Sequence, residues 1–143
     1  MHKKVVLIGG KGSCVDIAEE IEDARGRYGM DIEVLGFAFD DPAYRCGIND
    51  WPVLCGTHQA WSLYKDDPSV FFVFGMFRYD IAKERFALRD SYGIPLERFL
   101  TFIHPLAYVS RSAKNWSWIN YSFLCNNKEQ CYVRFSKLYK FRS

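Results

Sequence analysis

Short apolar runs alternate with amphipathic segments along most of the chain. The runs are too short for helices and rich in β-branched and aromatic residues, so they predict buried parallel strands at residues 5–8, 32–39, 51–54, 70–74 and 100–103. Segments with apolar residues at helical spacing lie between them and predict helices at residues 15–25, 58–65 and 80–92. This alternation predicts an α/β fold, a Rossmann-like three-layer domain whose parallel sheet has about five strands with helices on both faces.

The first strand runs directly into a glycine-rich turn that ends at a helix start. Such a turn needs glycine because the backbone visits positive φ and comes close to a ligand. The unpaired N–H groups and partial positive charge of a helix start favour a phosphate. The candidate phosphate-binding residues are Gly10, Lys11, Gly12 and Ser13. Only the first two glycines of the G-x-G-x-x-G pattern are present, Val15 stands at the third position, and no P-loop ending follows, so a tight turn without a ligand is the alternative.

Acidic residues mark the end of the second predicted strand. Asp40 and Asp41 precede Pro42 at the place where a dinucleotide-binding fold meets a ribose or base, and a carboxylate there can accept two hydrogen bonds from the nucleoside. Their distance from the glycines exceeds the usual spacing of about 20 residues, which disfavours a nicotinamide cofactor. The alternative is that these residues initiate a turn before the proline.

A second strand-to-loop junction follows the fourth predicted strand, at Gly75, Met76 and Arg78. Open α/β sheets bind ligands at the carboxyl edge where the strand order reverses, and the first and fourth strands flank that point. We therefore expect these residues to join the substrate site, with Arg78 holding a phosphate. A solvated arginine is the alternative.

Composition and charge narrow the class of protein. With 143 residues, of which 49% are hydrophobic, the chain has the size and apolar content of one α/β core. Residues 1–114 hold 14 of the 19 basic and 16 of the 17 acidic residues, a net charge of −2, whereas residues 115–143 carry a net charge of +4. The five scattered cysteines lack metal-ligand spacing, and no apolar run reaches membrane length. We therefore expect a cytoplasmic protein with reduced thiols and with no metal, nucleic acid or membrane as partner.

Five segments of the chain together resemble bacterial sugar O- and N-acyltransferases, the family of the pilin-glycosylation acetyltransferases and the sialic acid O-acetyltransferases. In order they are Lys-Val-Val-Leu-Ile-Gly-Gly-Lys-Gly-Ser, Leu-Gly-Phe with Asp-Asp-Pro, Trp-Pro-Val-Leu-Cys-Gly, Tyr-Gly-Ile-Pro-Leu-Glu-Arg-Phe and Phe-Ile-His-Pro-Leu-Ala-Tyr-Val-Ser-Arg-Ser-Ala-Lys. The resemblance spans residues 4–114. Its most specific part is the Ile-His-Pro segment leading into repeats of period six, in which Ile103 and Val109 are six residues apart, as are Ala107 and Ala113.

The resemblance implies a nucleotide-sugar-binding domain at residues 1–102, with a UDP-sugar as the expected ligand. The glycine turn would meet the nucleotide phosphates, and Asp40 would meet the base or ribose. In the family a C-terminal left-handed β-helix follows, which forms trimers, binds acetyl-CoA between subunits and supplies the general-base histidine. His104 would belong to the junction between the two domains and would not be that base.

The period-six repeats stop early in this chain. Residues 103–114 hold the onset of the β-helix hexads, and residues 115–143 form an aberrant, basic tail with no glycine or proline and with eight aromatics among 29 residues. Several β-helix turns cannot fit in that length. We therefore expect no catalytic residue and no cofactor in this chain, and self-association through residues 103–143. Codons for Asn-Trp-Ser-Trp-Ile-Asn-Tyr-Ser can be chosen so that a one-base shift encodes Ile-Gly-Val-Gly-Leu-Ile-Ile-Ala, which suggests an out-of-frame tail that sequencing of the gene would test.

Three functional hypotheses follow. The leading one is the nucleotide-sugar-binding domain of an acetyl-CoA-dependent sugar acyltransferase, without catalytic competence in this chain. A second is a stand-alone nucleotide-binding or regulatory module whose aromatic tail docks on a partner. The third is a fragment of an NAD(P)-dependent oxidoreductase, which the incomplete glycine pattern disfavours.

Overall fold

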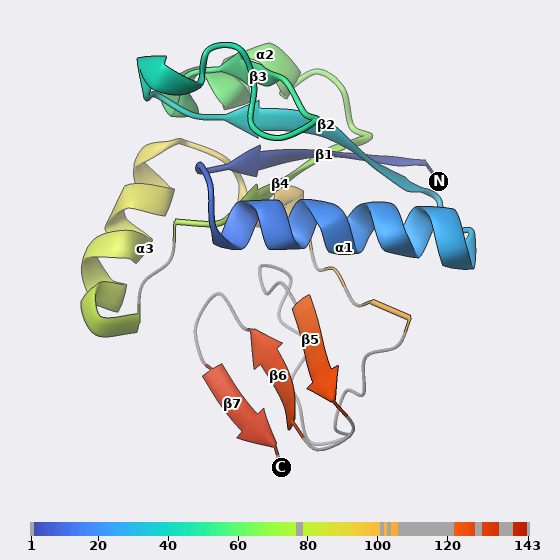
Figure 1. The fold of residues 1–143 in the computed structure, drawn as a ribbon. Helices are drawn as coiled ribbons and strands as arrows, with labels where there is room; N and C mark the ends of the chain where they lie inside the picture. The colour runs from blue at the N-terminus through green and yellow to red at the C-terminus, as the bar shows by residue number, and fades with distance from the viewer. Residues whose placement is uncertain are drawn as a thin grey trace.

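The computed structural model describes residues 2–76, 79–100, 102, 104–105, 122–127, 130–134 and 139–142. It is a mixed α/β structure (Figure 1) whose first part contains, in order, β1 (Lys3–Ile8), α1 (Ser13–Tyr28), β2 (Ile32–Ala38), β3 (Val53–Cys55), α2 (Ala60–Tyr64), β4 (Val70–Phe74) and α3 (Ala82–Ser91). Short 3-10 helices lie at η1 (Pro42–Tyr44), η2 (Thr57–Gln59), η3 (Tyr79–Ile81) and η4 (Leu96–Arg98). The α/β class expected from the alternation of strands and helices is confirmed.

The first four strands form one parallel sheet in the order β3-β2-β1-β4. The prediction of about five strands is wrong for the described residues. Where a fifth strand was expected, the structure has a single parallel bridge between Phe72 and Phe99, and the N–H of Leu100 donates to the carbonyl of Phe72 at 2.8 Å. Leu100 and Phe102 are both buried. The apolar pattern therefore predicted correctly that this segment is buried. It did not predict the pairing, because a buried segment need not form a continuous ladder of hydrogen bonds with β4.

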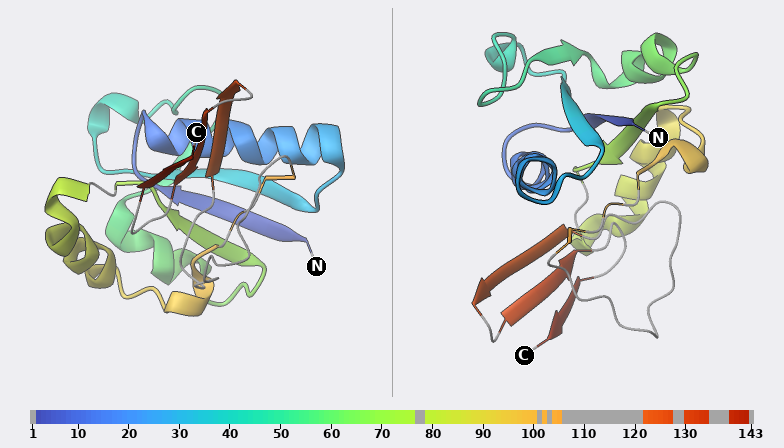
Figure 2. Two further views of the ribbon diagram at one scale, coloured as in Figure 1. Left: turned by 90° about the horizontal axis from the view of Figure 1, so that it is seen from below. Right: turned by 90° about the vertical axis from the view of Figure 1, so that its right-hand side faces the viewer.

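Two layers of helices cover the sheet, one on each face (Figure 2). Val5 and Leu7 of β1 lie in a buried cluster with the apolar residues of α1, while Val6 and Ile8 lie in a second cluster with residues of α2 and α3. All four are fully buried. Because side chains of a strand point alternately to opposite faces, a strand between two helical layers must be apolar at every position.

Helix α1 is longer than the sequence indicated, since we expected it to end near Arg25. It continues to Tyr28 and is capped by Gly29, which adopts a left-handed conformation with φ +65°. The N–H groups of Gly29 and Met30 donate to carbonyls of the last turn. Glycine commonly ends helices in this left-handed conformation. The helix therefore ends at Gly29 and continues through Gly26.

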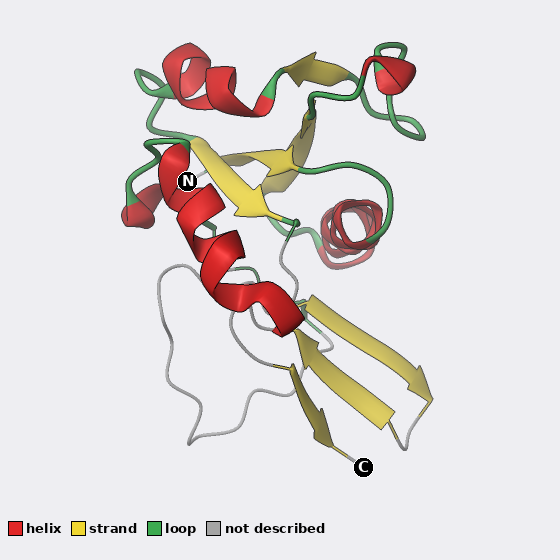
Figure 3. Cartoon of the chain, turned by 90° about the vertical axis from the view of Figure 1, so that its left-hand side faces the viewer, coloured by secondary structure: helices red, strands yellow, loops and turns green. Residues whose placement is uncertain are grey.

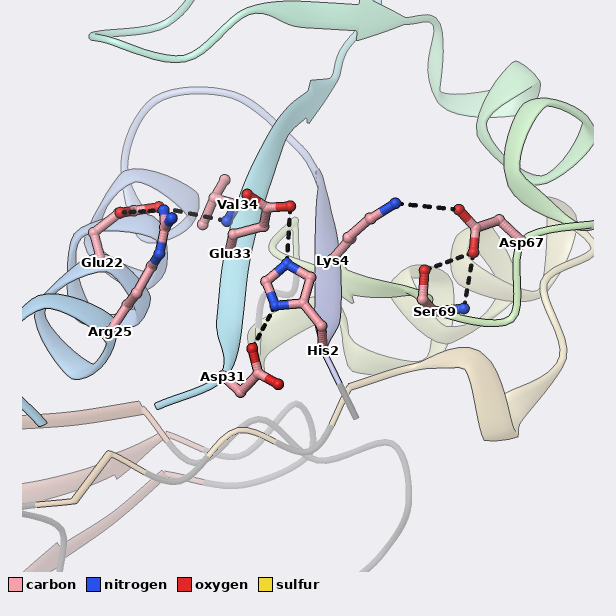
Figure 4. A network of polar contacts seen from close by, with 9 residues as sticks. All are labelled: His2, Lys4, Glu22, Arg25, Asp31, Glu33, Val34, Asp67 and Ser69. Carbon is pink, nitrogen blue, oxygen red and sulfur yellow. Dashed lines mark hydrogen bonds and ion pairs between the residues drawn. The ribbon is translucent and has the colours of Figure 1, made fainter. Parts of the chain in front are cut away.

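A network of polar side chains joins the amino ends of the strands (Figure 4). The imidazole of His2 lies between two carboxylates of the β2 side, with Nδ1 2.6 Å from Asp31 and Nε2 3.0 Å from Glu33. On the other side, Lys4 forms an ion pair with Asp67 at 3.6 Å. These contacts hold the start of β1 between its two neighbours, at the edge opposite to the one where the predicted ligand residues gather.

A second sheet lies in the C-terminal part of the chain, where the sequence predicted only an aberrant tail. It consists of the antiparallel strands β5 (Ser122–Asn127), β6 (Gln130–Arg134) and β7 (Tyr139–Arg142), in that order. The predicted β-helix hexads at residues 103–114 lie outside the described residues, apart from His104 and Pro105. In the described parts of the chain, no helix combines the length and the apolar character needed to cross a membrane.

Candidate functional site

The strand order reverses beside β1. The chain steps outward from β1 to β2 and β3, and then returns to place β4 on the opposite side of β1. Figure 3 looks toward the carboxyl edge of this sheet, where the loops that follow the strands come together. In open parallel sheets, the crevice beside such a reversal is the usual place for a ligand.

The glycine turn occupies this edge as the sequence predicted. Gly12 precedes α1 with φ +108°, and its carbonyl accepts from the N–H groups of Val15 and Asp16. A Cβ built on Gly12 would meet no atom within 4 Å. Lys11 is exposed, and its ammonium lies 5.9 Å from the ring centroid of Tyr44. The helix begins at Ser13. The space in front of the Gly12 Cα is therefore open, and Lys11, two residues before the helix, carries a positive charge there.

The space between the ends of β1 and β4 is filled. The thiol of Cys14 is 1% exposed, and a Cβ placed on Gly75 would lie only 1.9 Å from its sulfur. A Cβ on Gly9 would lie 2.7 Å from the same sulfur and 3.1 Å from Cγ of Met76. The two glycines therefore admit the thiol between the strands. Gly75 and Met76, which we expected to join the substrate site, pack against the glycine turn, and Arg78 lies outside the described residues.

A pocket of about 370 Å³ opens on the other side of the glycine turn, between the loop after β2 and the loop after β3. Both candidate acids of the second strand line it. The complete lining is Phe39, Asp40, Asp41, Pro42, Arg45, Val53, Leu54, Cys55, Gly56 and Gln59. Its volume is within the range of small-molecule sites, and it combines an aromatic ring, two carboxylates, a guanidinium and an amide.

The two acids have different roles in the structure. Asp40 Oδ1 accepts from the N–H of Thr57 at 2.9 Å, and Oδ2 accepts from the Thr57 hydroxyl at 2.7 Å. The hydrogen bond from this hydroxyl holds the pKa of Asp40 below its ordinary value. Asp41 accepts from the N–H of Ala43 at 2.9 Å and caps η1. The turn-initiating role therefore belongs to Asp41, whereas Asp40 ties the end of β2 to the start of η2.

Eight of the ten lining residues were not among the candidates from sequence, and three of them, Phe39, Arg45 and Gln59, add an aromatic ring or a polar group. Phe39 connects the pocket to the glycine turn, because a Cβ on Gly10 would lie 2.6 Å from its ring, and its centroid is 5.7 Å from that of Tyr44. Arg45 and Gln59 supply the guanidinium and the amide. A signal for Gln59 was present in the sequence, since a glutamine three residues after Gly56 matches the spacing of a helix-start cap. Arg45 follows η1 and had no comparable signal.

Two histidines in the described ranges, His58 and His104, contact neighbouring aromatic and polar side chains. His104 is 5% exposed, and its Nε2 lies 2.8 Å from Oδ2 of Asp23. It also contacts the Tyr28 ring edge-on, with centroids 5.5 Å apart, so it joins the chain after the sheet to α1. His58 is exposed and packs against Tyr92, with ring centroids 4.9 Å apart. Within the described ranges, no three His, Cys, Asp or Glu residues are grouped so that they could hold a metal ion.

No family model, no curated protein and no solved structure matches this chain.

Proposed function

We propose that residues 1–102 form a Rossmann-like domain that binds a nucleotide-linked sugar, with a UDP-sugar as the ligand, and that this domain is of the type found in acetyl-CoA-dependent sugar acyltransferases. The observation that carries the proposal is that two features lie next to each other at the carboxyl edge. Phe39 lines the pocket together with Asp40 and Asp41, and its ring packs against Gly10 of the glycine turn before α1.

Each end of this site suits one part of a nucleotide. The backbone before α1, next to Lys11, offers N–H groups and positive charge to the phosphates. Asp40 offers its carboxylate to the base or ribose. Although Thr57 donates once to each of its oxygens, every carboxylate oxygen has a second lone pair that can accept from a ligand.

The same geometry disfavours a dinucleotide. A dinucleotide spans the reversal point, with one half on each side of the first strand. Here the space between β1 and β4 is filled by the thiol of Cys14 and the side chain of Met76. A ligand with a single nucleoside, placed on the β2 and β3 side, fits without moving these groups.

The proposal assigns binding to this chain and leaves acetyl transfer out of it. His104 is buried against α1, and the predicted hexads stop at Lys114, so neither a base nor an acetyl-CoA groove is part of the proposal. The proposal includes self-association through residues 103–143 and a cytoplasmic location, which the free thiols of Cys46 and Cys55 support.

Calorimetric titration of the purified chain with UMP, UDP-sugars, NAD and acetyl-CoA tests the proposal. Binding of uridine nucleotides without binding of NAD is the expected result. Saturable binding of NAD would favour the oxidoreductase hypothesis instead, and no binding of any nucleotide would overturn the proposal.

A matched pair of glycine variants locates the phosphates. Gly12 and Gly29 both have positive φ, and a Cβ on either would meet no atom within 4 Å. Alanine therefore causes backbone strain of about 1–3 kcal/mol at each position, but only Gly12→Ala places a methyl group at the start of α1. We expect Gly12→Ala to weaken UMP binding and Gly29→Ala to preserve it. Equal affinities in both variants would remove the glycine turn from the site.

A further inference from the structure

One hydroxyl group joins the pocket to His58. The Thr57 hydroxyl donates to Oδ2 of Asp40 at 2.7 Å, and Nδ1 of the His58 imidazole lies 3.3 Å from the same hydroxyl oxygen. Asp40 lines the pocket, and so do Gly56 and Gln59, which stand before and after this pair of residues in the chain. The imidazole therefore lies at the border of the proposed nucleotide site, one hydroxyl away from its carboxylate.

The number of protons at this hydroxyl determines the tautomer of His58. A threonine hydroxyl has one proton and two lone pairs. The carboxylate takes the proton, because the hydrogen bond with Thr57 lowers the pKa of Asp40 and the ionised acid can only accept at neutral pH. The contact at 3.3 Å is then a hydrogen bond only if Nδ1 donates. In the neutral imidazole, Nε2 therefore carries no proton and is an acceptor.

Packing orients the imidazole and leaves it open to a ligand. The ring of His58 lies edge-on against Tyr92, with centroids 4.9 Å apart and an angle of 72° between the ring planes. Tyr92 is buried, so it provides a fixed support, whereas His58 is exposed. Among the described residues, Nδ1 is the only atom of this imidazole that makes a hydrogen bond. Nε2 is therefore an oriented acceptor that a ligand can reach.

We infer that His58 is a further ligand-binding residue of the site, and that its Nε2 accepts a hydrogen bond from a carbohydrate hydroxyl of the bound ligand. This inference rests on the proposed function and adds a residue to it. A hydroxyl suits this position because it is a neutral donor, whereas a phosphate would be repelled by the Asp40 carboxylate on the other side of Thr57. A nucleotide-sugar has hydroxyls on its ribose and on its sugar, and binding measurements distinguish these two sources.

The first test measures the tautomer by nitrogen NMR of the full chain with isotope-labelled histidine, at pH 8, where histidine side chains are ordinarily neutral. The signal that is absent from His58→Phe belongs to His58. We expect its Nδ1 to carry the proton in the wild type. Thr57→Val removes the hydroxyl but keeps the backbone N–H that donates to Asp40, so the signal of a protonated Nδ1 should weaken. A proton on Nε2 in the wild type would overturn the inference.

The second test compares two replacements of His58 in calorimetric titrations with UDP-N-acetylglucosamine and UMP. His58→Phe keeps a ring against Tyr92 but has no acceptor. His58→Gln has an amide oxygen as many bonds from the backbone as Nε2. We expect His58→Phe to weaken binding of UDP-N-acetylglucosamine by about threefold to tenfold, and His58→Gln to recover most of that loss. An equal loss for UMP would assign the contact to the ribose, and an unchanged affinity for UMP would assign it to the sugar.

The same replacement at the opposite edge of the sheet is the control. His2→Phe changes a histidine that contacts Asp31 and Glu33 at the amino ends of the strands, and it should leave both affinities unchanged. If His58→Phe binds both ligands as tightly as the wild type does, the inference is wrong and the proposed function remains. Failure of the wild type to bind either ligand would overturn the proposed function and the inference together.

Discussion

Removal of the Asp40 carboxylate should destabilise the protein as well as weaken its ligand binding. The carboxylate accepts both the N–H and the hydroxyl of Thr57, and Thr57 is 1% exposed. In Asp40→Ala these donors cannot turn to bulk water. The Thr57 hydroxyl can still turn to Nδ1 of His58, 3.3 Å away, so the N–H is the group that is left without a partner.

The expected loss of stability in Asp40→Ala follows from the hydrogen bonds that the variant lacks. An unpaired buried donor costs about 1–3 kcal/mol, and the loss of a hydrogen bond to a charged acceptor lies in a similar range. Asp40 itself is exposed, so water screens its charge and reduces its contribution. We expect the free energy of unfolding to fall by about 2 kcal/mol. Asp41→Ala loses one hydrogen bond, to the exposed Ala43, and should cost about 0.5–1 kcal/mol.

Urea unfolding of the wild type and both variants, followed by circular dichroism, measures these differences. The pH dependence supplies an internal check. The lowered pKa of Asp40 means that its contribution is fully present above the ordinary value of 3.8 and is lost as the pH falls through the folded value. The difference between wild type and Asp40→Asn should therefore shrink on acidification below that value. Equal unfolding midpoints for Asp40→Ala and Asp41→Ala would refute the reasoning.

Three further predictions concern other parts of the chain. Hydrogen bonds to Glu33, and to a smaller extent to Asp31, raise the pKa of His2 above 6.5. The wild type should therefore have a higher melting temperature than His2→Ala at pH 6, and the difference in melting temperature should vanish as the pH rises through the folded pKa. A difference of the same size at pH 6 and pH 9 would contradict this. Arg98 donates to four backbone carbonyls between the end of α2 and the start of β4, so Arg98→Met should lower the free energy of unfolding by about 2–4 kcal/mol in urea titrations. A loss below about 0.5 kcal/mol, as for an ordinary surface residue, would show that these bonds add little. Incubation with acetyl-CoA and UDP-amino-sugars should release no CoA above background, because His104 is buried against α1; turnover that disappears in His104→Ala would make this histidine a base.

Part of the candidate site could be predicted from the sequence because its residues follow strand ends. Gly12 and Asp40 lie at the carboxyl edge, as the order of strands and turns indicated. The partner of Asp40 could not be predicted in this way. Thr57 is 17 residues away in the chain, and only the pairing of β2 with β3 brings them together. The same pairing places Gln59 near Asp40, and no local pattern in the sequence predicts a contact between residues that follow two different strands.

The sequence also could not predict that the space between the ends of β1 and β4 is filled. Gly75 was a reasonable candidate for ligand contact, since glycine after a buried strand often permits close approach of a ligand. In the structure it permits close approach of the Cys14 thiol. A glycine in the sequence indicates that something lies close to the backbone, but which atom lies there depends on the packing of α1 against β4.

The sequence by itself determined the four strands β1 to β4, the three helices between and after them, and the α/β class, because the periodicity of apolar residues acts through each residue's near neighbours along the chain. It also determined the open glycine turn before α1, since positive φ at Gly12 is a local requirement. Only the tertiary structure decided that the sheet has four strands, that a thiol fills the space beside β4, and that Asp40 and Gln59 meet in one pocket. These features depend on hydrogen-bonded pairing and close packing between distant segments, and a one-dimensional pattern does not contain those distances.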